Sequence, residues 1–179
     1  MTLTRIITLV ALTLAIAMLP PHGMADSFCV APGLGIGFLK NTTGYALGVT
    51  GTYREGNPSV SARFLYAQEI TIFGSASESA SEFAILVGLD NFGDNGASIG
   101  FGLGVGKVQS ISRGKAYRDG DWIVGTRYEK VRATNWGLAA QFDAFLSRRF
   151  GLGFRGNFND SVSFLTFLLS VRIECVSDK

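Results

Sequence analysis

Carboxylate and guanidinium side chains are the groups in this chain best suited to chemistry, and they recur where small residues alternate with large apolar ones. The candidates are the acidic residues Glu69, Glu82, Asp90, Asp143 and Glu174 and the basic residues Arg63, Arg155 and Arg172. Two neighbouring carboxylates can act as a general acid and a general base. Because arginines share the same face, we expect opposite charges to pair there instead, since buried charges persist when they are paired.

Histidine chemistry is missing from most of the chain. The single histidine, His22, lies near the N-terminus, so residues 26–179 offer no histidine as a base beside a serine or an aspartate. The same region has no cluster of His and Cys residues with the spacing of a metal site. The glycine-rich runs at residues 33–37 and 100–106 lead into no helix, so they do not indicate a phosphate-binding loop. We therefore predict that the protein is not an enzyme and has no metal or cofactor.

Large apolar side chains alternate with glycine, alanine, serine or a charged residue in eight runs. In the clearest run, residues 97–106, Ile99, Phe101, Leu103 and Val105 alternate with a serine and glycines. A period of two is typical of β-strands, whose successive side chains point to opposite faces. The runs lie at residues 33–38, 44–54, 60–70, 82–90, 97–106, 136–146, 150–158 and 165–174, with Phe164 and Leu168 as exceptions to the pattern.

The sizes of the side chains on the two faces of the strands distinguish a membrane barrel from a soluble one. Small residues fit the narrow interior of a closed barrel, and a bulky apolar outer face fits lipid. In a soluble lipocalin-like barrel the large apolar residues would lie inside, but an eight-stranded barrel has too little interior volume for them. The sequence therefore predicts an all-β, eight-stranded antiparallel up-and-down transmembrane β-barrel.

The first 25 residues predict a secretory signal peptide. Arg5 precedes an apolar stretch at residues 6–19, and Gly23, Met24 and Ala25 form a small-residue cleavage pattern. The apolar stretch is shorter than the roughly 20 residues that a transmembrane helix needs. We therefore expect cleavage after Ala25 and one barrel domain over residues 26–179. The formal net charge of +2 gives no reason to expect a nucleic-acid partner.

The two cysteines lie at the ends of the barrel sequence. Cys29 precedes the first run and Cys175 follows the last, and closure of a barrel makes the first and last strands neighbours. In an oxidising compartment we expect a disulfide between them, which would stabilise the fold by roughly 4 to 5 kcal/mol in the chain-entropy model. The alternative is two free thiols. Cys29 is out of phase with the large residues of the first run unless Pro32 resets the register.

One connection is long enough to present a surface beyond a membrane. With both termini in the periplasm, the short turns at 54–59, 90–96 and 147–149 face the periplasm, and residues 107–133 form an external hairpin. Its candidate contact residues are Arg113, Lys115, Tyr117, Arg118, Trp122, Arg127 and Tyr128. Such cationic and aromatic side chains can bind lipid phosphates or a partner surface. The alternative is that two strands simply run past the membrane with their charges solvated.

The closing segment WGLAAQFDAFLSRRFGLGFRGNFNDSVSFLTFLLSVRIE, together with the signal peptide and the eight runs, carries a resemblance to a known family. Over roughly residues 30–175 the chain resembles the small eight-stranded outer-membrane β-barrels of Gram-negative bacteria, which include the membrane domain of outer membrane protein A. The resemblance implies an outer-membrane location, contacts with outer-membrane lipid and lipopolysaccharide, and a monomer with an unidentified surface partner.

These observations predict a non-catalytic outer-membrane barrel with a structural or surface-interaction role, in which hairpin 107–133 is the contact region. Two alternatives come from other classes of function. One is a soluble periplasmic lipocalin-like barrel that binds a hydrophobic ligand. The other is a narrow pore, which a lumen filled with charged side chains disfavours.

Overall fold

The computed structural model describes residues 27–70, 77–92, 97–117, 127–160 and 162–177, and within these it leaves out the side chains of residues 27, 91–92, 116–117, 127–128 and 174–177. The described residues form nine β-strands. They are β1 (Ser27–Phe38), β2 (Thr43–Arg54), β3 (Pro58–Glu69), β4 (Ser79–Phe92), β5 (Ser98–Tyr117), β6 (Arg127–Phe145), β7 (Phe150–Phe158), β8 (Phe164–Val171) and β9 (Ile173–Ser177). In this part of the chain, no helix is long and apolar enough to cross a membrane.

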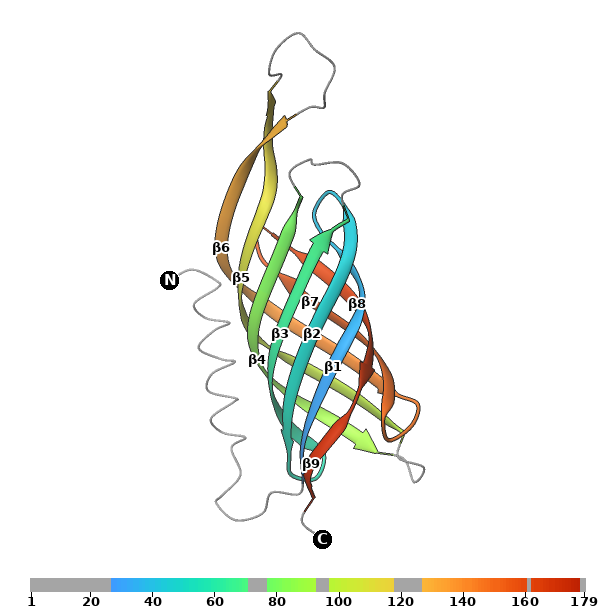
Figure 1. The fold of residues 1–179 in the computed structure, drawn as a ribbon. Helices are drawn as coiled ribbons and strands as arrows, with labels where there is room; N and C mark the ends of the chain where they lie inside the picture. The colour runs from blue at the N-terminus through green and yellow to red at the C-terminus, as the bar shows by residue number, and fades with distance from the viewer. Residues whose placement is uncertain (1–26, 71–76, 93–96, 118–126, 161, 178–179) are drawn as a thin grey trace, which may run out of the picture.

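The strands close into a barrel (Figure 1). Each strand from β1 to β7 pairs antiparallel with the next, and β1 also pairs with β8 and β9. Because β8 and β9 are separated by Arg172 alone, together they occupy the eighth position around the wall. The predicted eight-stranded antiparallel up-and-down barrel is therefore confirmed.

The last strand is broken where the sequence predicts a continuous run. The pairing of β1 with β8 ends at Gly33 and Ser170, and pairing with β9 resumes at Val30 and Ile173. Pro32, which has no amide hydrogen to donate, lies in this gap. The backbone N–H of Arg172 instead donates to Arg149 O at 2.6 Å. The break thus ties the end of β8 to the turn between β6 and β7.

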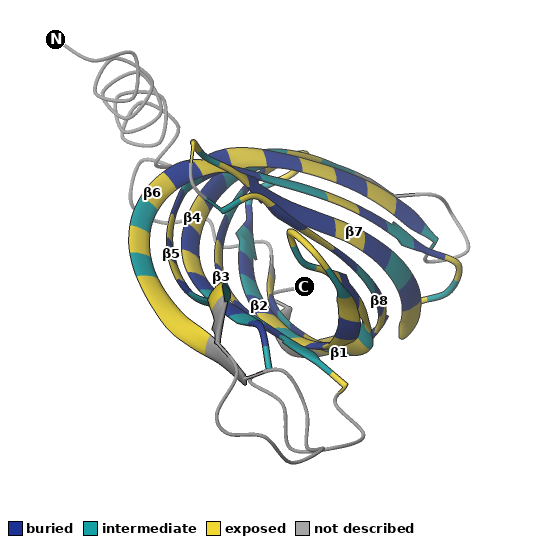
Figure 2. Cartoon of the chain, turned by 90° about the horizontal axis from the view of Figure 1, so that it is seen from above, coloured by how far each residue is buried: buried dark blue, intermediate teal, exposed yellow. Residues whose placement is uncertain are grey.

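Buried and exposed residues alternate along the barrel wall (Figure 2). Large apolar residues point outward on every side of the barrel, as shown by Leu34, Leu89, Leu103 and Leu169, which are 41 to 60% exposed. The inward positions hold glycine, alanine, hydroxyl residues and buried charges. The lipocalin-like alternative, with the large apolar residues inside, is therefore wrong.

A small apolar core fills the lumen toward one end. Its buried members are Ala46, Leu65, Ala67, Ala80, Val108, Phe164 and Leu168. Phe164 and Leu168, the exceptions in the sequence pattern, thus point inward and fill space that smaller residues would leave empty. Gly48 leaves room for these side chains, because a Cβ at this position would lie 2.7 Å from Leu65 Cδ2 and 2.9 Å from Leu168 Cδ1 and would displace them.

The two ends of the barrel differ. At one end, called here the hairpin end, β5 and β6 continue beyond the other strands; at the other, the turn end, lie β9 and the β2–β3 and β6–β7 turns (Figure 1). The first strand begins at Ser27, earlier than the sequence pattern predicts, and its register against β2 runs unbroken from Ser27 to Phe38. Pro32 therefore does not reset the register, and Cys29 points inward with 4% exposure.

Candidate functional site: the lumen and the hairpin

The middle of the lumen contains a buried ion pair between β3 and β4. Arg63 Nη2 and Nε donate to Glu82 Oε2 at 2.7 and 3.1 Å. The guanidinium also donates to backbone carbonyls across the lumen, at 2.9 Å to Ala140 and 3.2 Å to Gly156. Asn157 Nδ2 donates to the second oxygen of Glu82 at 2.8 Å. Both charged side chains are fully buried, so the pair links four strands.

A second buried pair lies between β6 and β7. Arg155 Nη2 donates to Asp143 Oδ1 at 3.2 Å and to Ser170 Oγ at 3.3 Å. Gln141 Nε2 donates to the other oxygen of Asp143 at 2.6 Å. Within the described residues, Nε and Nη1 of Arg155 have no hydrogen-bond partner. The two ion pairs occupy the lumen with opposite charges that neutralise each other.

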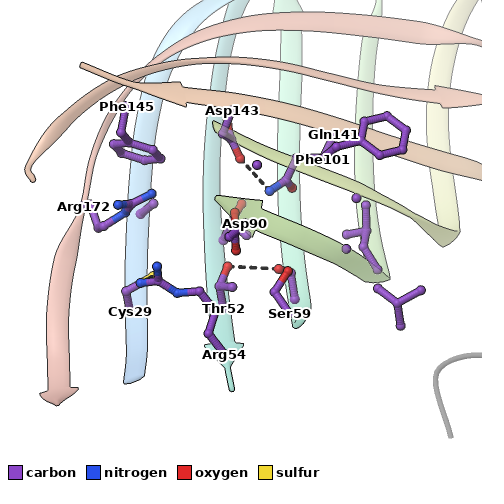
Figure 3. Close-up of a pocket in the computed structure, with 18 residues that line it drawn as sticks. Cys29, Thr52, Arg54, Ser59, Asp90, Phe101, Gln141, Asp143, Phe145 and Arg172 are labelled. Atoms are coloured by element: carbon purple, nitrogen blue, oxygen red, sulfur yellow. Dashed lines mark hydrogen bonds between the residues drawn. The ribbon is translucent and has the colours of Figure 1, made fainter. Parts of the chain in front are cut away.

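A cavity of about 30 Å³ lies on the turn-end side of these pairs (Figure 3). Its lining includes Cys29, Thr52, Arg54, Asp90, Asp143 and Arg172. Arg172 Nη2 donates to Ser98 Oγ at 2.7 Å, and its guanidinium carbon lies 3.6 Å from the centre of the Phe145 ring. A water molecule needs about 10–15 Å³ of such volume, so the cavity has room for two or three waters. It is too small for an organic substrate or a lipid chain.

A polar cluster closes the hairpin end of the lumen. Glu69 forms an ion pair with Arg113, accepts a hydrogen bond from Thr42 Oγ1 at 3.2 Å, and accepts another from the backbone of Glu78 at 3.1 Å. Glu78 Oε1 in turn accepts from Asn41 Nδ2 at 3.0 Å and from the Arg113 backbone at 3.3 Å. Two carboxylates therefore join the β1–β2 loop to the base of the hairpin. In the part of the chain that the structure describes, no three His, Cys, Asp or Glu residues are grouped as a metal site requires.

The β5–β6 hairpin carries exposed basic side chains beyond the barrel wall. β4 pairs with β5 as far as Ile111, whereas β5 and β6 remain paired to Tyr117 and Arg127. The exposed basic residues beyond the wall are Lys115, Lys130 and Arg132, whereas the exposed Lys107 is still paired with Phe83 of β4. Lys107 lies opposite Trp136, which is 56% exposed. Tryptophan beside basic residues at the edge of an apolar wall is typical of a membrane–water boundary.

Comparison with solved structures identifies the fold. Ail, the attachment invasion locus protein of Yersinia pestis, matches with a TM-score of 0.52 and 13% identity over 84% of this chain and 100% of that chain, in a complex with the heparin analogue sucrose octasulfate. Neisserial surface protein A matches with a TM-score of 0.55 and 9% identity over 86% and 98% of the two chains. The N-terminal β-barrel domain of Pseudomonas aeruginosa OprF matches with a TM-score of 0.50 and 10% identity over 85% and 100%.

The chain has the fold of the small outer-membrane β-barrels. The predicted resemblance is thereby confirmed at the level of architecture. No family model and no curated protein sequence matches the chain. At these identities the likeness establishes the outer-membrane barrel fold alone, and each neighbour's ligand or role belongs to that neighbour.

The structure places most of the predicted lumen residues inside this outer-membrane-type barrel. Arg63 lies with Glu82, Arg155 with Asp143, and Asp90 and Arg172 line the small cavity. Glu69 lies in the cluster at the hairpin end. The side chain of Glu174 is outside the described set.

One of the predicted contact residues of the hairpin, Arg113, has a different environment from the one predicted. Arg113 is not a free surface cation, because it is partly buried and paired with Glu69. Lys115 is exposed. Arg118 and Trp122 lie outside the described residues, as do the side chains of Tyr117, Arg127 and Tyr128.

Two buried charges are absent from the predicted set of lumen charges. Arg54 lines the cavity and is 4% exposed, and Glu78 holds the cluster at the hairpin end and is 2% exposed. In the sequence pattern, Arg54 lies where run 44–54 meets the 54–59 turn, and Glu78 lies between runs 60–70 and 82–90. The alternation of inward and outward residues could have identified both, because Arg54 continues the inward positions of β2 and Glu78 is an even number of residues from the inward Glu82.

The two cysteines lie close in register at the turn end. Cys29 is a buried free thiol in this structure, and its Sγ accepts a hydrogen bond from Arg54 Nη2 at 3.5 Å. Cys29 pairs with Glu174 and Phe28 with Val176, so Cys175 is the extra residue of a β-bulge beside Cys29. The side chain of Cys175 is not among those described, and the disulfide stays a prediction.

Proposed function

We propose that the chain is a non-catalytic barrel of the Gram-negative outer membrane with a structural or surface-interaction role. The band of exposed large apolar side chains around the closed barrel carries this proposal, because lipid is the solvent that such a surface fits. Residues 1–25 would direct export and be cleaved. The immediate partners would be outer-membrane lipid and lipopolysaccharide around a single chain.

The packing of the lumen supports a role without catalysis. The buried carboxylates Glu82 and Asp143 bond to arginine and amide donors of the barrel itself. The neighbouring cavity of about 30 Å³ holds water at most. The same packing speaks against the narrow-pore alternative, since an open water path would have to cross both ion pairs.

We also propose the 107–133 hairpin as the contact region. Its strands extend beyond the wall, and Lys115, Lys130 and Arg132 are exposed there. A rigid scaffold that presents an extended connection is a common way to place a binding surface. The basic side chains favour an anionic partner outside the membrane.

Deletion of residues 114–127 is expected to leave a folded barrel in the membrane fraction while abolishing binding of the anionic partner proposed for the hairpin. The deletion joins Arg113 to Tyr128, leaving two residues before Lys130, the register partner of Arg113, which is the length of a tight hairpin turn. Folding is measured as different gel mobility of boiled and unboiled protein. Protease added to intact cells should cut the wild type at Lys115 and spare the variant.

Three results of this experiment would contradict separate parts of the proposal. A wild-type chain recovered in the soluble periplasmic fraction, with one mobility, overturns the membrane placement. Cleavage at Lys115 that requires opening of the outer membrane reverses the orientation. Surface binding that persists in the folded deletion variant removes the hairpin as the contact region.

Exported protein is expected to contain a Cys29–Cys175 disulfide. The bulge in β9 brings Cys175 beside the position that pairs with Cys29, and the periplasm is oxidising. Mass spectrometry without reductant should detect one linked pair of peptides, and a Cys175→Ser control should lose it. Complete alkylation of both thiols in unreduced protein would contradict the disulfide and leave the barrel proposal intact.

A further inference from the structure

An open hollow of about 480 Å³ lies at the turn end, beside the break between β8 and β9. Arg148, Arg149, Val171, Arg172 and Ile173 line it. Val171 and Ile173 are 36 and 53% exposed and belong to the outward, apolar face of the wall. The hollow therefore combines an apolar wall with arginines at the edge of the lipid-facing surface.

The β6–β7 turn holds the backbone of the two exposed arginines in a fixed conformation. Ser147 Oγ accepts hydrogen bonds from the backbone N–H groups of Arg149 and Phe150 at 3.3 and 3.1 Å. The Leu146 N–H donates to Phe150 O at 3.0 Å, and Arg149 O accepts from Arg172 N at 2.6 Å. The turn is thus fastened both internally and to the last strand.

The two arginine side chains on this turn have no polar partner among the described residues. Arg148 and Arg149 are exposed, and neither guanidinium makes a hydrogen bond or ion pair with the described residues. None of the residues that line the hollow is acidic. The β2–β3 turn at the same end carries Glu55 instead, so the positive charge is local to this side of the barrel.

The flanking residues place the two arginines at a lipid boundary. Leu146 precedes them and Phe150 follows them, with 77 and 56% exposure. Exposed apolar residues next to arginines match a ligand that has an acyl chain and an anionic headgroup. A guanidinium binds phosphate oxygens through two parallel hydrogen bonds, which makes arginine well suited to such a headgroup.

We propose that this hollow binds an anionic phospholipid from the membrane leaflet at the turn end. The phosphate group lies between the guanidinium groups of Arg148 and Arg149, and an acyl chain runs along Val171 and Ile173. This site rests on the proposed membrane placement of the barrel. The β6–β7 turn that carries the site lies at the opposite end of the barrel from the hairpin.

The site is tested by measuring lipid binding to a variant in which glutamine replaces both exposed arginines. Folded full-length barrel in non-ionic detergent is mixed with phosphatidylglycerol or phosphatidylcholine, and bound lipids are counted by native mass spectrometry. Each basic residue near an anionic lipid surface contributes about 1 kcal/mol, so Arg148→Gln with Arg149→Gln is expected to lower phosphatidylglycerol affinity about 30-fold. Phosphatidylcholine binding should not change.

A control removes a positive charge at the other end of the barrel. Lys40→Gln changes an exposed lysine of the β1–β2 loop and should leave phosphatidylglycerol binding unchanged. The lipid site is wrong if Lys40→Gln loses as much phosphatidylglycerol affinity as the Arg148 and Arg149 double variant, or if that double variant binds as well as the wild type, provided that both variants show the heat-dependent gel shift of a folded barrel. If the wild type itself shows no heat-dependent gel shift, the proposed membrane placement of the barrel is wrong, and the lipid site falls with it.

Discussion

Leu103→Arg is expected to prevent stable insertion of the barrel into lipid. Leu103 lies near the middle of the part of β5 that pairs with β4, opposite Val87, and is 41% exposed. An arginine near the bilayer midplane of a transmembrane barrel costs roughly 2–4 kcal/mol. Refolding into vesicles, measured as the fraction of chains with shifted gel mobility, should fall at least tenfold.

Val131→Arg is the matched control for this substitution. Val131 has a similar exposure of 43% but lies on the hairpin extension, between Lys130 and Arg132. Because this position is beyond the apolar wall, the same change from an apolar side chain to arginine should leave insertion intact. A folded, water-soluble Leu103→Arg protein would show that the outward face meets water rather than lipid.

Arg63→Ala is expected to destabilise the folded barrel by about 3–5 kcal/mol, because it leaves the buried carboxylate of Glu82 without its counter-charge. The substitution also removes the donors to the Ala140 and Gly156 carbonyls. Urea unfolding of the barrel in lipid vesicles, followed by tryptophan fluorescence, measures the loss. The expected result is a lower midpoint with little change in slope.

Two further variants separate charge burial from general packing. Arg113→Ala removes a partly exposed ion pair with Glu69, for which we expect a loss of about 1 kcal/mol or less. Arg63→Met with Glu82→Leu removes both charges at once and should recover most of the stability lost in Arg63→Ala. Equal small losses for Arg63→Ala and Arg113→Ala would indicate that water reaches the middle of the lumen.

The inside and the outside of the barrel could be predicted from particular residues. Leu103 and Phe101 share one parity and are exposed, whereas Arg63 and Glu82 fall at small-residue positions and are buried. The prediction works because the side chains of a β-strand alternate strictly, so residue size and charge along one strand reveal what each face contacts. The two inward-pointing exceptions, Phe164 and Leu168, could not be placed by pattern.

The residue pattern was sufficient to predict the strand alternation, the outward apolar face, the barrel class and most of the charges that point inward. The tertiary structure alone decided which of those charges meet. Arg63 bonds to carbonyls 77 and 93 residues away, and Arg113 reaches Glu69 across 44 residues, because strand register and barrel closure set the height of each side chain. Register and closure depend on pairings between distant segments, which a local residue pattern does not determine. For the same reason, the hydrogen bond from Arg172 N to Arg149 O, beside the hollow at the turn end, could be found only in the closed barrel.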